Sequence, residues 1–166
     1  MRSARGSTVT SLRLISAGVL LLAGGVAYAD PCKITIESND RMQFNTHELA
    51  VAANCSDVEV TLKHSGQLPA KVMGHGWVLA KESDVSAIAS AGLAAGLARG
   101  WLAQNDKRII AFTKVVGGGE ATTVKFSTTA LVSGTRYAFF CSSPGHSSVM
   151  RGLFLFGDTR VAQAGK

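Results

Sequence analysis

The stretch Tyr137-Ala-Phe-Phe-Cys141-Ser-Ser-Pro-Gly-His146-Ser-Ser-Val-Met150 joins a strand-like apolar run to a loop that carries a cysteine, a histidine and a methionine. Its Cys-x4-His-x3-Met spacing places three potential metal ligands on one loop, and Pro144-Gly145 is a turn pair that can bring the chain back on itself. A thiolate, an imidazole and a thioether suit copper, and a second histidine would complete a trigonal plane. The candidate for that histidine is His75, which stands between two glycines far upstream.

Short runs with the character of β-strands surround this loop, and glycines and polar turns separate them. In one of them, Val58, Val60 and Leu62 alternate with polar residues, which is the period of a half-buried strand. Several such strands in one small chain indicate an all-β sandwich or barrel. The expected strands are 33–37, 48–52, 58–64, 76–80, 109–116, 122–127, 137–141 and 152–156.

One segment has a helical period instead. From position 85 onward the apolar residues fall on one face of a helix. These residues are Val85, Ile88, Ala89, Leu93 and Leu97. Ser83 is the expected N-cap and Gly100 the expected stop. We therefore expect one short helical insert that packs against the sandwich.

Residues 1–29 have the pattern of a cleaved signal peptide. Three arginines precede an apolar run at 15–26, and Ala27-Tyr28-Ala29 is a typical cleavage site. The apolar run is shorter than the roughly 20 residues that a membrane span needs, and no later stretch approaches that length. We expect an exported mature chain without a membrane span, one domain at 30–157 and a flexible tail at 158–166.

The charge of the chain argues against nucleic acid as a partner. The full chain has a net charge of +6, but removal of Arg2, Arg5 and Arg13 leaves 14 basic residues against 11 acidic ones, which is about +3. No run of basic residues and no alternation of basic and aromatic residues is present. Binding to phosphates would call for a clustered basic patch.

Three cysteines in an exported chain indicate one disulfide and one remaining thiol. Cys32 and Cys55 lie beside strand-like runs in the N-terminal part, whereas Cys141 lies beside His146 and Met150. We therefore pair Cys32 with Cys55. The chain-entropy argument gives this crosslink a stabilisation of about 3 kcal/mol.

Other interpretations of the same residues stay open at this point. A copper chaperone or storage protein can use the same ligands, and zinc can occupy such a site. A hydrolase with Cys141 as nucleophile would leave Met150 without a role. Of the remaining histidines, His64 is expected to be structural and His47 to be solvated.

Five segments of the chain resemble the azurins, a family of periplasmic blue copper proteins. They are Met42-Gln-Phe-Asn-Thr46, Leu68-Pro69, Val72-Met-Gly-His-Gly-Trp-Val-Leu79, 108–114 and 137–150. The spacings from Cys32 to Met150 fit the azurin pattern without a gap. The resemblance implies an eight-stranded Greek-key sandwich with a helical flap and a Cys32–Cys55 disulfide.

The resemblance also implies one copper ion per chain, with defined ligands. His75, Cys141 and His146 would be the strong equatorial ligands. Met150 and the backbone carbonyl of Gly74 would be long axial contacts. Trp77 would be buried in the core.

As in the azurins, electrons would pass through His146 and an apolar surface patch. By position, the patch consists of Met42, Leu68, Val72, Met73 and Pro144. The implied partners are redox proteins such as c-type cytochromes or a copper nitrite reductase. A small apolar contact suits such brief encounters.

Three positions differ from the usual azurin pattern. Gly76 replaces an asparagine that fixes the ligand loop, and Ser143 replaces a phenylalanine. Both changes predict a shifted reduction potential, because groups around metal ligands tune them. Ser65 replaces a proline after the histidine that matches His64, so we do not extend the pH switch of those azurins to this chain.

Overall fold

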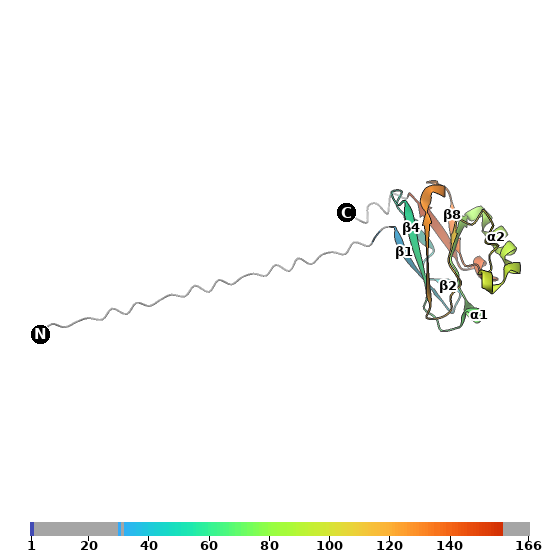
Figure 1. Ribbon diagram of the computed structural model, residues 1–166, viewed down its shortest axis with the longest axis horizontal. Helices are drawn as coiled ribbons and strands as arrows, with labels where there is room; N and C mark the ends of the chain where they lie inside the picture. The colour runs from blue at the N-terminus through green and yellow to red at the C-terminus, as the bar shows by residue number, and fades with distance from the viewer. Residues whose placement is uncertain (2–29, 31, 158–166) are drawn as a thin grey trace.

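The computed structural model describes residues 1, 30 and 32–157. The predicted tail at 158–166 and all of the predicted signal peptide except Met1 lie outside the described residues. The described part of the chain is mainly β-structure with one longer helix (Figure 1).

Within 32–157, nine strands form two mixed sheets. The four-stranded sheet has the order β2-β1-β4-β7, and the five-stranded sheet has the order β3-β9-β8-β5-β6. The strands are β1 (Lys33–Asn39), β2 (Gln43–Phe44), β3 (Glu48–Val51), β4 (Asp57–His64), β5 (Val78–Lys81), β6 (Ala111–Phe112), β7 (Ala121–Ser127), β8 (Tyr137–Phe140) and β9 (Arg151–Phe156). The predicted all-β Greek-key sandwich is confirmed, as an open sandwich rather than a closed barrel.

The residue patterns of two strands explain their places in the sheets. In β4, Val58, Val60 and Leu62 are buried and alternate with more exposed residues, so one face of this strand points into the core. In β8 all four residues are buried. This strand lies between β5 and β9. A helix covers its outer face, which accounts for the unbroken apolar run.

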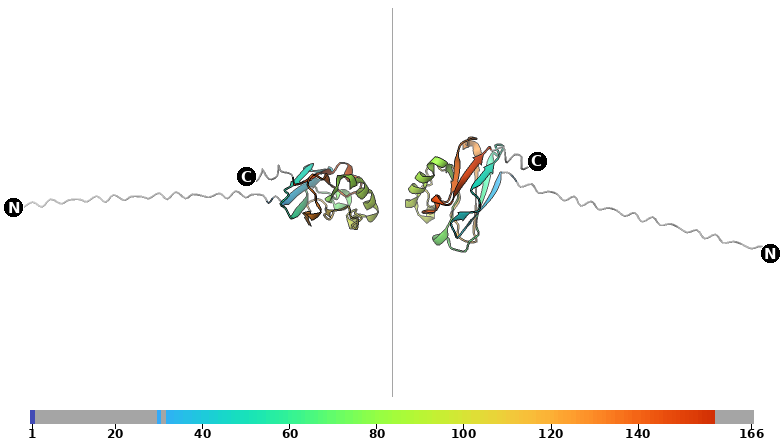
Figure 2. Two further views of the ribbon diagram at one scale, coloured as in Figure 1. Left: turned by 90° about the horizontal axis from the view of Figure 1, so that it is seen from above. Right: turned by 180° about the vertical axis from the view of Figure 1, so that it is seen from behind.

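The helical segment lies outside the sandwich, on the side of the five-stranded sheet (Figure 1), and the two further views agree (Figure 2). It consists of η1 (Glu82–Asp84), α2 (Val85–Gly92), η2 (Leu93–Ala95) and η3 (Leu97–Arg99). Val85 and Ile88 are buried in a second apolar cluster together with residues of β5 and β8. The helical insert is therefore held by packing, as expected for a weak autonomous helix.

The ends of this insert differ from the prediction. Ser83 is not the N-cap, because η1 precedes α2 and Asp84 takes that position. The α-helix ends at Gly92, whose close contact with the backbone of Trp101 leaves no room for a Cβ atom. Leu93 is 52% exposed, so it does not belong to the buried face. Gly100 does end η3, in the left-handed region.

Two strands also differ from the expected pattern. The run at 109–116 forms only the short β6 and an isolated bridge from Val116 to His75. The two-residue β2 was not predicted, because it is too short to show a period and pairs only with the end of β1. The predicted Cys32–Cys55 disulfide is confirmed. Trp77 is fully buried, in contact with Phe126, Phe139 and Phe154.

Candidate metal centre

The ligand loop connects two adjacent strands and is closed at its ends. Cys141 follows β8 directly, and its N–H donates to the carbonyl of Met150 at 2.9 Å, just before β9 begins. The N–H of Met150 donates to the carbonyl of His146 at 2.7 Å. Gly145 has a φ of 79°, a conformation that favours glycine, and it turns the chain into η5 (His146–Ser148). Backbone geometry therefore sets the positions of all three predicted loop ligands.

His75 enters the site from a distant part of the chain. Its backbone forms a bridge with Val116, with N–H to carbonyl distances of 3.0 and 2.9 Å. Its ring Nε2 lies 2.8 Å from the carbonyl oxygen of Asn39. A carbonyl oxygen only accepts hydrogen bonds, so Nε2 carries the proton and Nδ1 is left with a free lone pair. The role of Asn39 could not be predicted from the sequence, since this residue acts through its backbone carbonyl.

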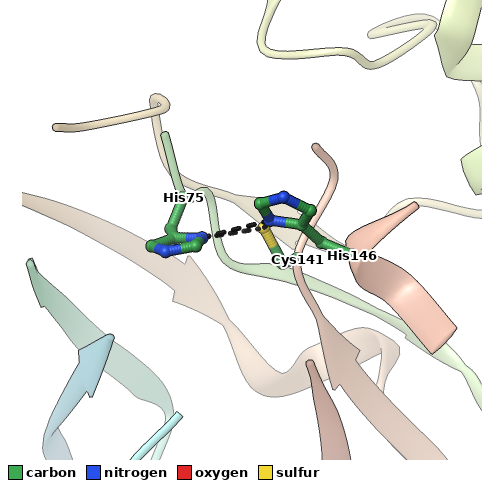
Figure 3. Close-up of side chains that lie close together, drawn as sticks. All are labelled: His75, Cys141 and His146. Carbon is green, nitrogen blue, oxygen red and sulfur yellow. Dashed lines mark hydrogen bonds between the residues drawn. The ribbon is translucent and has the colours of Figure 1, made fainter. Parts of the chain in front are cut away.

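The three predicted equatorial ligands converge in the interior (Figure 3). Cys141 Sγ lies 3.7 Å from His75 Nδ1 and 3.6 Å from His146 Nδ1, and the two nitrogens are 3.3 Å apart. A first-row metal with bonds of about 2.0–2.1 Å to nitrogen and about 2.3 Å to sulfur, in a trigonal plane, needs edges of about 3.5 and 3.8 Å. The donor set therefore fits a small metal ion.

The two predicted axial contacts, Met150 and the Gly74 carbonyl, adjoin the equatorial ligands along the chain or in the core. Met150 is fully buried and belongs to the same core as Cys141. Gly74 precedes His75 in a closely packed turn, where a Cβ atom would lie 2.4 Å from the carbonyl oxygen of Ala70. Its own carbonyl oxygen accepts a buried hydrogen bond from Ser143 Oγ at 2.6 Å.

Burial governs the protonation of the site. It lowers the pKa of His75 to about 4 and lowers the pKa of His146, so both rings are neutral near pH 7. Burial also raises the pKa of the Cys141 thiol, and the backbone N–H groups of Ser143 and Gly76 oppose that shift. Both imidazoles are therefore ready to coordinate a metal ion, and the Cys141 thiol would lose its proton on binding one.

The surroundings of the ligand loop show the effect of Gly76. The hydroxyl of Ser142 is buried and has no hydrogen-bond partner among the described residues. This hydroxyl faces Gly76: a Cβ atom at position 76 would lie 2.9 Å from Ser142 Oγ. Position 76 therefore lacks the side chain that could satisfy Ser142. The missing side chain is evident from the sequence, whereas the unpaired serine beside it is evident only from the fold.

The side chain of Ser143 is buried, and its hydroxyl donates a short hydrogen bond of 2.6 Å to the carbonyl of Gly74. A hydroxyl has a single proton, and this short distance directs it at the carbonyl. The same hydroxyl also lies close enough to Cys141 to oppose the rise in the pKa of that thiol.

The other two histidines stay outside the donor set. His64 is buried beside His75, with ring centroids 4.7 Å apart. Its Nε2 lies 2.8 Å from the carbonyl of Met73, and its Nδ1 accepts from the N–H of Gly66 at 3.0 Å. Both ring nitrogens of a neutral imidazole are thus satisfied. His47 is exposed.

Most residues of the predicted docking patch are exposed. Met42, Leu68 and Val72 are 39%, 38% and 63% exposed, and Pro144 is also exposed. Met73, the last residue of the short α1 (Ala70–Met73), is half-buried. His146 itself is 9% exposed. Among the described residues, no helix is long and apolar enough to cross a membrane.

Two neutral imidazoles and one thiol, buried at the end of a Greek-key sandwich with a methionine beside them, define a copper protein of the cupredoxin class. Residues 30–156 match the family of copper binding proteins described as the plastocyanin/azurin family. The chain belongs to this family, and copper is its cofactor.

The similar proteins are azurins. The chain is 49% identical to an azurin of Pseudomonas fluorescens biotype A over 121 residues, which is 73% of this chain and 94% of that protein. It is 47% identical to an azurin of Alcaligenes faecalis over 127 residues, covering 76% and 99% of the two chains. A solved structure of an azurin from the methylotroph Methylomonas sp. strain J matches with a TM-score of 0.74 and 43% identity, over 76% of this chain and 98% of that one.

Proposed function

We propose that this protein is a periplasmic one-electron carrier and not an enzyme. In this proposal His75, Cys141 and His146 would hold one copper ion, and Met150 and the Gly74 carbonyl would be weaker ligands. Bound copper supplies the one-electron couple Cu(I)/Cu(II). The observation that supports the proposal is the convergence of the three donor atoms, all within 4.8 Å of one another.

The protein's contribution is to keep these donors in place during electron transfer. Cys141 is held by β8 and by its bond to Met150, and His75 is held by its bridge to Val116. Neither element belongs to a loose surface loop. A scaffold that keeps one geometry for both oxidation states leaves little to rearrange when an electron arrives.

His146 provides the route for the electron in this proposal. It is the ligand with a small exposed fraction, 9%, whereas Cys141 and His75 are fully buried. The predicted docking patch, Met42, Leu68, Val72, Met73 and Pro144, would surround it. Its exposed apolar side chains suit short-lived contacts with redox proteins such as c-type cytochromes or a copper nitrite reductase.

The burial of Cys141 counts against the hydrolase alternative. A nucleophilic cysteine needs an accessible thiolate. Cys141 is fully buried, and burial raises its pKa. The role that remains for this thiol is that of a metal ligand.

Electron exchange and copper exchange distinguish a carrier from a copper-handling protein. Electron self-exchange is measured by NMR line broadening in mixtures of the oxidised and reduced protein. Copper loss is measured by transfer to a Cu(I) chelator. We expect rapid electron exchange and slow copper loss. Slow electron exchange with rapid copper transfer would instead indicate a chaperone or storage protein.

The proposed location rests on residues 1–29 and on the disulfide. Disulfides persist in oxidising compartments such as the periplasm, and Cys32–Cys55 is formed. Expression of the full chain followed by mass spectrometry of the periplasmic fraction tests this point. We expect a mature protein that begins near Asp30. Recovery of the uncleaved chain in the cytoplasm would contradict it.

A further inference from the structure

Ser143, on the ligand loop, makes hydrogen bonds to three groups of the copper site. The N–H of Ser143 is directed at Cys141 Sγ, and its carbonyl accepts the N–H of His146 at 3.0 Å. Its hydroxyl donates to the carbonyl of Gly74 at 2.6 Å, across 69 positions of the chain. The first two bonds use the backbone, which any residue provides. The third depends on the serine side chain.

We propose that Ser143 is a positioning residue that restrains the Gly74 carbonyl through its hydroxyl and weakens the contact of that carbonyl with copper. The proposal rests on the assignment of Gly74 as an axial contact under the proposed function. Because Ser143 lies on the Cys141 loop and Gly74 precedes His75, this one bond ties together the two segments that supply the ligands.

The consequence for copper follows from the lone pairs of the carbonyl oxygen. A carbonyl has two lone pairs, and the Ser143 hydroxyl occupies one of them. A hydrogen bond of 2.6 Å also draws electron density from the oxygen. Hard oxygen donors favour the more highly charged ion, and soft sulfur donors favour Cu(I). A weakened carbonyl therefore stabilises Cu(II) less and raises the reduction potential.

The local packing keeps this arrangement in place. Ser143 is 6% exposed, so water does not compete freely for its hydroxyl. Gly74 lies against Ala70 and Val115, which limits movement of its peptide group. Within the described part of the chain, the Ser143 hydroxyl is the donor to this oxygen.

The test combines a carbonyl resonance with a potential. In Ser143→Ala we expect the carbonyl carbon of Gly74 to shift upfield in the NMR spectra of both the copper-free and the Cu(I) protein. We expect the potential measured by voltammetry to fall. Ser143→Thr keeps the hydroxyl and should keep the resonance and the potential near those of the parent protein. Ser143→Val has the shape of Ser143→Thr without the hydroxyl and should behave like Ser143→Ala.

Ser142→Ala is the matched control, because it removes the neighbouring hydroxyl that has no partner. It should leave the Gly74 resonance unchanged. An unmoved resonance in Ser143→Ala, or an unchanged potential despite a moved resonance, overturns the proposal. A parent protein that binds no copper refutes the proposed function instead, and the resonance of the copper-free protein distinguishes the two failures.

Discussion

His75 Nδ1 and His146 Nδ1 lie 3.3 Å apart, although 71 positions separate the two residues in the chain. A bridge to Val116 fixes the first histidine, and the turn at Gly145 fixes the second. Two neutral imidazoles at this distance, with a thiol beside both, give the site its affinity for a metal ion. Burial of the two rings, which lowers the pKa of both, also makes the copper-free site sensitive to protons.

The copper-free protein is expected to lose stability as the pH falls from about 6.5 to about 4. Burial lowers the pKa of folded His75 to about 4, against 6.5 for the unfolded chain. The unfolded chain therefore binds more protons over this range, and the full loss for His75 is about 3 kcal/mol. His146, whose pKa is also lowered, acts in the same direction. Urea unfolding of the copper-free protein at pH 7 and pH 4.5 measures the effect.

His75→Gln is the control for this pH dependence. It removes the titrating ring, so its stability should change less between the two pH values than that of the parent. Equal stability of the parent at pH 7 and pH 4.5 would contradict the account.

Gly76→Asn is expected to stabilise the ligand loop and to shift the reduction potential. The new amide can satisfy the unpaired hydroxyl of Ser142 once that side chain rotates away from the new Cβ atom. One such hydrogen bond contributes about 1 kcal/mol. Thermal unfolding and voltammetry measure the two effects. Gly76→Ala, the control, supplies the Cβ atom without a partner and should be less stable than Gly76→Asn.

Two outcomes would count against this view of Gly76 and Ser143. If Gly76→Asn is no more stable than Gly76→Ala, Ser142 does not gain a partner. If both Gly76→Asn and Ser143→Phe keep the potential of the parent protein, these two positions do not tune the site.

Val72→Glu is expected to slow electron transfer to a c-type cytochrome, because it places a charge in the proposed docking patch. Val72 is 63% exposed, so the substitution should not disturb folding. The matched control is Val132→Glu, at a residue that is 64% exposed in the connection between β7 and β8. Stopped-flow kinetics measures the rates. Equal rates for the two variants would show that the patch is not the docking surface.

Met150→Leu is expected to keep the blue absorption and to change the potential, because an axial thioether tunes the site rather than holding the metal. Leucine has a similar volume, and the site is fully buried. Absorption spectroscopy and voltammetry give the two values. Loss of the absorption band would assign Met150 a stronger role than an axial contact.

The sequence predicted the elements whose residues repeat regularly or stand at diagnostic spacings. The alternation in β4 and the spacing of Cys141, His146 and Met150 are of this kind. The end of α2 at Gly92 was missed because it depends on contact with Trp101, which no local pattern reveals. The bond from Ser143 to Gly74 was missed for the same reason, since it joins two segments that only the fold brings together.

The absorption spectrum of the oxidised, copper-loaded protein tests the central claim most directly, when measured beside that of Cys141→Ser. We predict an intense blue charge-transfer band for the parent protein, with a narrow copper hyperfine splitting in its electron paramagnetic resonance spectrum. The band should be lost in Cys141→Ser, because the thiolate is its origin. Retention of the band in that variant would contradict the assignment of Cys141 as a copper ligand.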